Sequence, residues 1–201
     1  MNHNRLLAAI IENGIAHELT SEVRAALASL IRARALMRGA FILSSGKEAS
    51  YYLDLRKLTL SSDAAALIAY LFLEKIEQDV THVGGPVIGA DPIVGSIVTL
   101  SRFVGRDISG FLVRKEPKKH GTQSWLEGPV VAGARVCLVE DVVTTGGSLL
   151  SAADRVREAG LKPVQALCLV DREEADVASA FAERGIAYEP IFSVSELLAQ
   201  E

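Results

Sequence analysis

Apolar residues recur along the chain at two different spacings. Over residues 6–38 they lie three or four positions apart, as in Val23, Leu27, Leu30 and Ile31, which predicts a helical segment with a cap at Thr20 or Ser21. Over residues 40–60 apolar and polar residues mix around a Ser-Ser-Gly turn, which predicts a strand pair or hairpin. The chain thus begins with helix and continues into a small antiparallel unit.

From residue 63 onward, helical patterns alternate with short apolar runs of strand length. Helices are expected over 63–78, 90–104, 149–159 and 173–184, and strands over 80–83, 108–113, 164–170, 186–192 and from 136. This alternation predicts an α/β fold with a doubly wound, mainly parallel sheet. Ligands of such sheets bind outside the carboxyl ends of the strands, where the polar motifs of this chain also fall.

Composition narrows the class of protein. The 201 residues are 49% hydrophobic, enough for one domain with a sizeable core, and the net charge of −4 argues against nucleic acid or anionic membrane as a partner. No apolar run reaches membrane length or resembles a secretory signal. Cys137 and Cys168 lie inside apolar runs without metal-ligand spacing, so reduced thiols in a cytoplasmic protein are expected.

The most informative stretch covers residues 136–148. An apolar strand ends in Glu140 and Asp141, and a turn rich in Thr, Gly and Ser then leads into a helix. Free backbone N–H groups at such a turn suit a phosphate, whereas two carboxylates suit sugar hydroxyls with a divalent cation nearby. The pattern indicates a ribose phosphate, although an acidic strand end before a glycine turn is also ordinary connecting structure in α/β proteins.

A second motif lies in the connection over residues 114–128. Five cationic or titratable side chains occur within seven residues: Arg114, Lys115, Lys118, Lys119 and His120. The connection is long and has little apolar periodicity, which favours an active-site lid over a solvated charge run. Neither the P-loop pattern nor G-x-G-x-x-G is present, so kinase-type and dinucleotide-binding functions are disfavoured.

Residues 136–148 resemble the ribose-phosphate signature of the type I phosphoribosyltransferases, and the spacing of Arg114, Lys115, Lys118 and His120 resembles the mobile loop of the orotate phosphoribosyltransferases. The resemblance implies one domain over 1–201, with a helical segment over about 1–38, a hood at 40–60, a core sheet at 63–192 and a mobile loop at 114–128. The hood would also include the chain ends.

The resemblance also implies roles for individual residues. The catalytic set would be Lys118, His120 and Asp141. Phosphoribosyl pyrophosphate would be bound by Arg114, Lys115, Lys118, His120, Glu140, Asp141, Val142, Val143, Thr144, Thr145, Gly146, Gly147 and Ser148. Orotate would be bound by Thr144, Arg172, Tyr52 and Lys47, of which Lys47 could equally be an exposed turn lysine and Arg172 part of a surface ion pair.

The implied reaction converts orotate and phosphoribosyl pyrophosphate into orotidine 5′-phosphate and pyrophosphate, a step of pyrimidine biosynthesis. Mg²⁺ would be held mainly by the substrate, and the loop would act across a homodimer. The glycine-rich loop at 84–91 resembles the pyrophosphate-side loop but has no lysine. Two alternatives remain: a transferase for another base, or a non-catalytic regulator that senses phosphoribosyl pyrophosphate. Residues 1–38 lack the concentrated basic face that a DNA-binding regulator would need.

Overall fold

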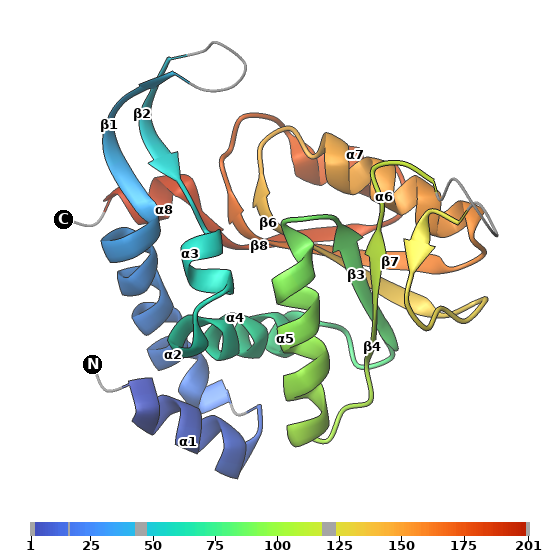
Figure 1. Cartoon of the computed structure of the whole chain (residues 1–201), viewed down its shortest axis with the longest axis horizontal. Helices are drawn as coiled ribbons and strands as arrows, with labels where there is room; N and C mark the ends of the chain where they lie inside the picture. Colours follow the sequence, from blue (N-terminus) through green and yellow to red (C-terminus); the bar gives the residue numbers. More distant parts are fainter. Residues whose placement is uncertain (1–2, 16, 43–47, 118–123, 200–201) are drawn as a thin grey trace.

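The computed structural model describes residues 3–15, 17–42, 48–117 and 124–199. Its main element is a six-stranded sheet with the strand order β5-β4-β3-β6-β7-β8 (Figure 1). The strands are β3 (His82–Pro86), β4 (Ser109–Val113), β5 (Leu126–Glu127), β6 (Arg135–Val143), β7 (Lys162–Asp171) and β8 (Ala187–Ser193). All neighbours are parallel except β5, which runs antiparallel to β4. The predicted mainly parallel sheet is confirmed.

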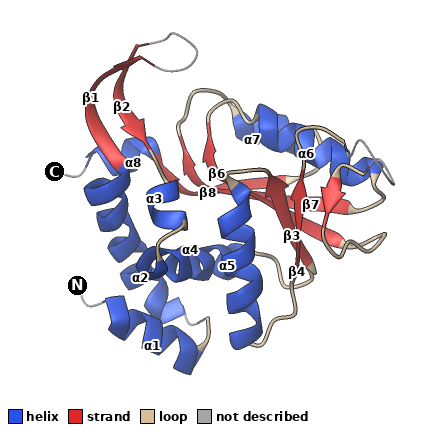
Figure 2. Ribbon diagram, in the orientation of Figure 1, coloured by secondary structure: helices blue, strands red, loops and turns tan. Residues whose placement is uncertain are grey.

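Helices cover both faces of this sheet (Figure 2). Side chains of β6 alternate between two cores: Cys137 and Val139 pack with α4 (Ser62–Lys75) and α5 (Ala90–Phe103), whereas Val136 and Leu138 pack with α6 (Gly147–Glu158) and α7 (Val177–Ala182). Burial of these apolar side chains is the main force that holds the layers together. Both cysteines are buried and unpaired, as expected.

The order of the strands opens a crevice at one edge of the sheet. The chain moves outward from β3 to β4 and then returns to place β6 on the other side of β3. The pairing between β3 and β6 ends at Gly84 and Leu138, so the segments that follow these residues separate. Ligand sites of doubly wound sheets lie at such a point of reversal.

The N-terminal segment is helical, but it ends earlier than the sequence indicated. Helix α1 (His3–Asn13) is followed by α2 (His17–Leu30), a π-helical turn η1 (Ile31–Ala35) and strand β1 (Leu36–Ile42). The expected helix to residue 38 is therefore wrong, because Leu36 to Arg38 pair with β2 instead. Thr20 and Ser21 lie inside α2 and do not cap it, whereas the predicted apolar stripe from Val23 to Ile31 is buried.

The predicted hairpin consists of β1 and β2 (Glu48–Leu53), and it projects from the body of the molecule (Figure 1). It is followed by α3 (Arg56–Thr59) and adjoins α8 (Val194–Ala199), where Arg38 Nη2 donates to the Leu198 carbonyl over 2.8 Å. Arg24 of α2 forms an ion pair of 2.6 Å with Glu196 of α8. The hood is therefore built from both ends of the chain.

One further expectation needs correction, and two elements were not anticipated. The helix predicted over 173–184 is shortened to α7, because Glu173 adopts a left-handed backbone conformation (φ 57°) and Asp176 caps the helix by accepting from Ser179 N at 3.0 Å. Strand β5 and helix α8 were not predicted. None of the helices within the described ranges is both long and apolar enough to cross a membrane.

Candidate active site

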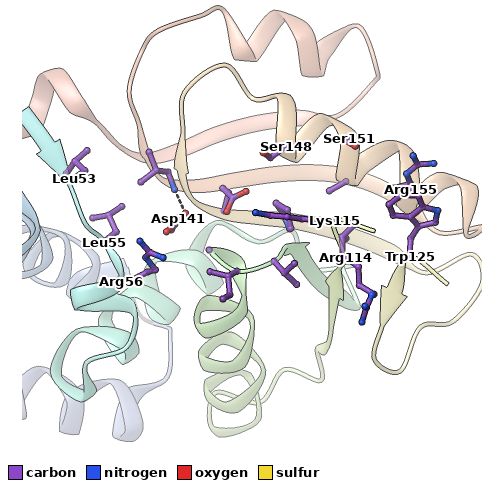
Figure 3. A pocket seen from close by; sticks show the side chains of 18 of the residues that line it. Leu53, Leu55, Arg56, Arg114, Lys115, Trp125, Asp141, Ser148, Ser151 and Arg155 are labelled. Atoms are coloured by element: carbon purple, nitrogen blue, oxygen red, sulfur yellow. Dashed lines mark hydrogen bonds between the residues drawn. The ribbon is translucent and has the colours of Figure 1, made fainter. Parts of the chain in front are cut away.

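A cleft of about 590 Å³ lies over the carboxyl ends of β3, β4 and β6 (Figure 3). Asp141 lies at its centre, Arg56 and Leu53 flank it on the hood side, and Trp125 and Arg155 flank it on the opposite side. Its walls come from Trp125 and from four segments of the chain that are distant in sequence: 53–56, 86–89, 113–115 and 140–155. The point of strand reversal therefore carries the largest concentration of the predicted site residues.

Glu140 and Asp141 form the floor of the cleft at the end of β6. Glu140 is 8% exposed, and Asp141 Oδ1 accepts from Val142 N at 2.8 Å. Burial and the adjacent charge of Asp141 raise the pKa of Glu140 to about 9, so Glu140 is protonated at neutral pH in the unliganded protein. One of the two adjacent acids is thus neutral, which reduces their mutual repulsion.

The loop after β3 approaches this floor closely. A Cβ atom on Gly89 would lie 2.4 Å from Asp141 Oδ1 and 2.5 Å from Glu140 Oε1, and one on Gly85 would lie 2.0 Å from the Val139 carbonyl oxygen. At Gly85 the neighbour is backbone, so only glycine fits there, whereas a side chain at position 89 would displace the two carboxylates. The Oδ1 atom of Asp91 is buried and has no hydrogen-bond partner among the described residues, and burial raises the pKa of Asp91.

The turn after the two acids encloses a small hollow of about 60 Å³ beside the cleft. Gly146 has a left-handed conformation (φ 77°) and directs the chain into α6, whose first residues, Gly147 to Leu149, line the hollow. The first N–H groups of a helix have no partner within the helix. Every residue of the predicted motif from Glu140 to Ser148 lines either the cleft or this hollow. The combination of helix N-terminus, glycines and hydroxyls is suited to binding one phosphate group.

The two ends of the basic connection are held together below the cleft. Arg114 N donates to the Trp125 carbonyl over 2.9 Å, Arg114 Nη1 lies 3.1 Å from Glu127 Oε1, and β5 pairs with β4. Arg114 and Lys115 both line the cleft. The predicted catalytic residues Lys118 and His120 lie outside the described residues.

Arg155 was not predicted from the sequence. It extends from α6 and stacks over the Trp125 ring, with its Cζ atom 3.9 Å from the ring centroid (Figure 3). Ser148, Ser151 and Arg155 all line the cleft, at the spacing that places residues on one helix face. That spacing after the phosphate turn is the signal that could have identified Arg155.

Arg172 follows β7 and joins the sheet to the hood. Its Nε atom donates to the Tyr51 hydroxyl over 3.0 Å, its Nη2 lies 2.9 Å from Glu174 Oε1, and its backbone N donates to the Val143 carbonyl over 2.9 Å. The side chain is 15% exposed, so the ion pair with Glu174 is only partly at the surface.

The aromatic residue beside Arg172 is Tyr51. Tyr52 lies on the other face of β2 and contacts Phe41, with the ring centroids 5.9 Å apart. The alternation of side chains along a strand separates these neighbours, but which of them faces the sheet depends on tertiary packing. Lys47 lies outside the described residues, and Thr144 lines the phosphate-sized hollow.

Comparisons with known proteins agree with this geometry. Residues 60–189 match the phosphoribosyl transferase domain family. The orotate phosphoribosyltransferase of Thermosynechococcus vestitus is 42% identical over 183 residues, which cover 90% of this chain and 96% of that protein. The corresponding protein of Rhodopirellula baltica is 43% identical over 179 residues, covering 86% and 92% of the two chains.

A solved structure shows the same likeness. Mycobacterium tuberculosis orotate phosphoribosyltransferase in complex with 5-phospho-alpha-D-ribosyl 1-diphosphate superposes with a TM-score of 0.72 at 37% identity, covering 87% of this chain and 98% of that one. The sequence similarity extends over nearly the whole length of these relatives. The family match over residues 60–189 includes the cleft segments 86–89, 113–115 and 140–155. The chain therefore belongs to the orotate phosphoribosyltransferase family.

Proposed function

We propose that the protein transfers the 5-phosphoribosyl group from phosphoribosyl pyrophosphate to orotate, giving orotidine 5′-phosphate and pyrophosphate. The observation that carries this proposal is a cleft with an acidic floor and a cationic lining that includes Arg114 and Lys115, next to a phosphate-sized hollow. A ring nitrogen of orotate attacks C1 of the ribose, the bond from C1 to the pyrophosphate oxygen breaks, and the proton of that nitrogen is released to solvent. No covalent bond to the protein is required.

The floor and the hollow would hold the sugar phosphate. Glu140 and Asp141 accept hydrogen bonds from the 2- and 3-hydroxyls of the ribose. In its protonated state Glu140 can also donate one hydrogen bond to a hydroxyl. The 5-phosphate occupies the hollow formed by Val142 to Ser148, where the backbone N–H groups and the hydroxyls of Thr144, Thr145 and Ser148 act as donors. Fixing C1 in this way lowers the entropic part of the barrier.

Mg²⁺ is proposed as the cofactor. Among the described residues, no group of three or more His, Cys, Asp or Glu side chains is arranged to hold a metal ion. The carboxylate of Asp141 in the cleft nevertheless fits a divalent ion whose other ligands are substrate oxygens. When bound, the ion would offset the charge of the pyrophosphate. Asp141 would orient the sugar, and Gly89 would leave room for the ligand beside it.

Positive charge would act on the leaving group. Arg114 and Lys115 line the cleft, and Lys118 and His120 follow them on the same connection. Negative charge grows on the pyrophosphate as the bond to C1 breaks, and cations placed there stabilise the transition state more than the ground state. We assign Lys118 and His120 this role, and Arg114 and Lys115 the binding of the phosphates.

Orotate would lie between the sugar and the hood. The guanidinium of Arg172 can pair with the orotate carboxylate, and Thr144, Tyr52 and Lys47 are the other proposed contacts. The position of Tyr51 against Arg172 makes Tyr51 the better aromatic candidate. The proposed site of action is the cytoplasm, for which the two unpaired thiols give support.

A homodimer with the loop shared between subunits is part of the proposal. An apolar groove of about 660 Å³ runs along α1, α4 and α5. Around it Ile11, Leu60 and Phe103 are 61%, 74% and 66% exposed. Large exposed apolar side chains gathered on one face are typical of protein interfaces. A second copy of the chain on this face would bury them.

The direct test of the base specificity compares acceptors. Purified protein is supplied with phosphoribosyl pyrophosphate and Mg²⁺ and with orotate, hypoxanthine or adenine, and the nucleotide product is measured. We expect turnover with orotate alone. Turnover with a purine and not with orotate would establish a transferase for another base. Binding of DNA in a gel-shift assay without any turnover would favour the regulator.

A further inference from the structure

Arg172 holds the carboxylate of Glu174. Its Nη2 atom lies 2.9 Å from Glu174 Oε1, and its Nε atom is occupied by the Tyr51 hydroxyl at 3.0 Å. The backbone of Arg172 is fixed as well, since its N–H donates to the Val143 carbonyl at 2.9 Å. Any anion that uses this guanidinium has to share it with Glu174 or displace Glu174.

Glu174 is the more exposed partner of this pair. Its side chain is 37% exposed, against 15% for Arg172. The turn around it is pinned by other residues: Asp171 accepts from Glu173 N at 2.8 Å and from the Tyr188 hydroxyl at 2.7 Å, and Glu173 accepts from Ser195 N at 3.0 Å. Glu174 can therefore rotate into solvent while the turn and Arg172 stay in place.

We infer that Glu174 is an internal competitor for the acceptor carboxylate, occupying Arg172 until a carboxylate-bearing base displaces it. This inference rests on the proposed function of Arg172 in orotate binding. A carboxylate tethered two residues away has a high effective concentration, so it lowers the apparent affinity of Arg172 for free anions. A base without a carboxylate does not engage the guanidinium, so the competition lowers the apparent affinity for carboxylate-bearing bases and leaves that for other bases unchanged.

The inference is tested with Glu174→Gln, which keeps the size of the side chain and removes its charge. The KM for orotate is measured at saturating phosphoribosyl pyrophosphate, and the KM for phosphoribosyl pyrophosphate at saturating orotate. A partly exposed ion pair contributes on the order of 1 kcal/mol, so the KM for orotate is expected to fall about three- to fivefold. The KM for phosphoribosyl pyrophosphate is expected to stay the same.

Uracil, which lacks the carboxylate, separates competition from a general loosening of the site. Its inhibition constant is measured against orotate in both proteins and is expected to be equal. A matched control is Glu77→Gln, which removes an ion pair of 3.0 Å with Arg135 near the amino ends of the strands. That variant is expected to have unchanged KM values.

Three results would overturn the inference. A rise in the KM for orotate in Glu174→Gln would mean that Glu174 only supports Arg172. An unchanged KM would mean that the two carboxylates do not compete. Equal tightening of orotate and uracil would point to a looser pocket. Failure of the underlying function would look different, because the unmodified protein itself would then show no turnover of orotate.

Discussion

Glu140 occupies the most unusual electrostatic position among the site residues. It is buried at the end of β6 beside Asp141, and its pKa is raised to about 9. A charged Glu140 would be unfavourable in the unliganded fold, so the protein keeps it protonated. A ligand that brings positive charge to the floor reverses that balance, because it favours the charged form.

The raised pKa predicts a specific pH dependence of stability. From the ordinary value of 4.5 up to about 9, folded Glu140 holds a proton that the unfolded chain releases. The contribution of protonated Glu140 to the free energy of unfolding is therefore fully present below pH 4.5, falls as the pH rises, and is lost at about pH 9. Glu140→Gln removes this loss, and its free energy of unfolding at pH 9 should exceed that of the unmodified protein by on the order of 2 kcal/mol.

Urea denaturation at pH 5, 7 and 9 measures this difference. The curves of the two proteins are expected to diverge as the pH increases. Asp176→Asn is a useful comparison, because hydrogen bonds from Ser179 lower the pKa of Asp176, so its effect on the pH dependence is confined to acid conditions. A constant difference between Glu140→Gln and the unmodified protein from pH 5 to 9 would contradict the assignment.

The residues of the floor could be predicted from the sequence because they follow one another in the chain. The string from Glu140 to Ser148 lines the cleft and the hollow without interruption. The orotate side was harder, because Tyr51 and Tyr52 differ only in the face of β2 on which they lie. That face is set by the pairing of β2 with β1 and the packing of the hairpin on the sheet, which a local pattern does not encode.

At the scale of elements, the connection between β4 and β6 is anchored at both of its ends. Its basic residues Lys118, Lys119 and His120 lie between these ends in the sequence. The pairing of β5 with β4 and the stack of Arg155 on Trp125 hold the ends of the connection against α6. In the proposed mechanism, a loop with its ends anchored in this way would close over the cleft without a change in the sheet. The short strand β5 was not predicted because two residues give no periodicity, and it exists only through its partner.

Trp125 is the single tryptophan of the chain, so tryptophan fluorescence reports on this anchored end of the connection. Addition of phosphoribosyl pyrophosphate with Mg²⁺ is expected to change its emission. Arg155→Met keeps the packing and removes the cation over the ring. We expect it to alter the emission of the free protein and to lower kcat about three- to tenfold, the range corresponding to a cation–π contact of roughly 1 kcal/mol.

Arg157→Met is the matched control for this experiment. Arg157 lies two positions further along α6 and donates to the Arg184 carbonyl, away from the cleft. It should leave both the emission and kcat unchanged. Equal behaviour of the two variants would show that the stack has no part in holding the loop.

At the scale of the whole molecule, the alternation of helix and strand patterns was enough to predict the parallel sheet and its two covered faces. The pattern did not locate the end of the N-terminal helix. Leu36 to Arg38 pair with strand β2, which follows later in the sequence, and a local pattern does not show this pairing. Helix α8 was also missed, since its position depends on contacts such as Arg24 with Glu196, 172 residues apart in sequence.

The proposed sharing of the loop between subunits predicts complementation. Lys118→Ala is expected to lower kcat much more than it weakens orotate binding, and Asp141→Asn is expected to disable the floor. A mixed dimer contains one site in which an intact loop meets an intact floor, so mixing the two variants should restore up to about a quarter of the activity. Absence of any recovery after subunit exchange would count against a shared loop.

The central claim is that the cleft and the adjoining hollow bind the ribose phosphate, that cations stabilise the leaving pyrophosphate, and that Arg172 next to the hood binds the orotate carboxylate. The most direct measurement is pyrophosphate release from phosphoribosyl pyrophosphate in the presence of Mg²⁺, with and without orotate, in the unmodified protein and in Asp141→Asn. The account predicts release that requires orotate, matches the orotidine 5′-phosphate formed, and is strongly reduced in Asp141→Asn. Release that is independent of orotate, or undiminished in Asp141→Asn, would contradict it.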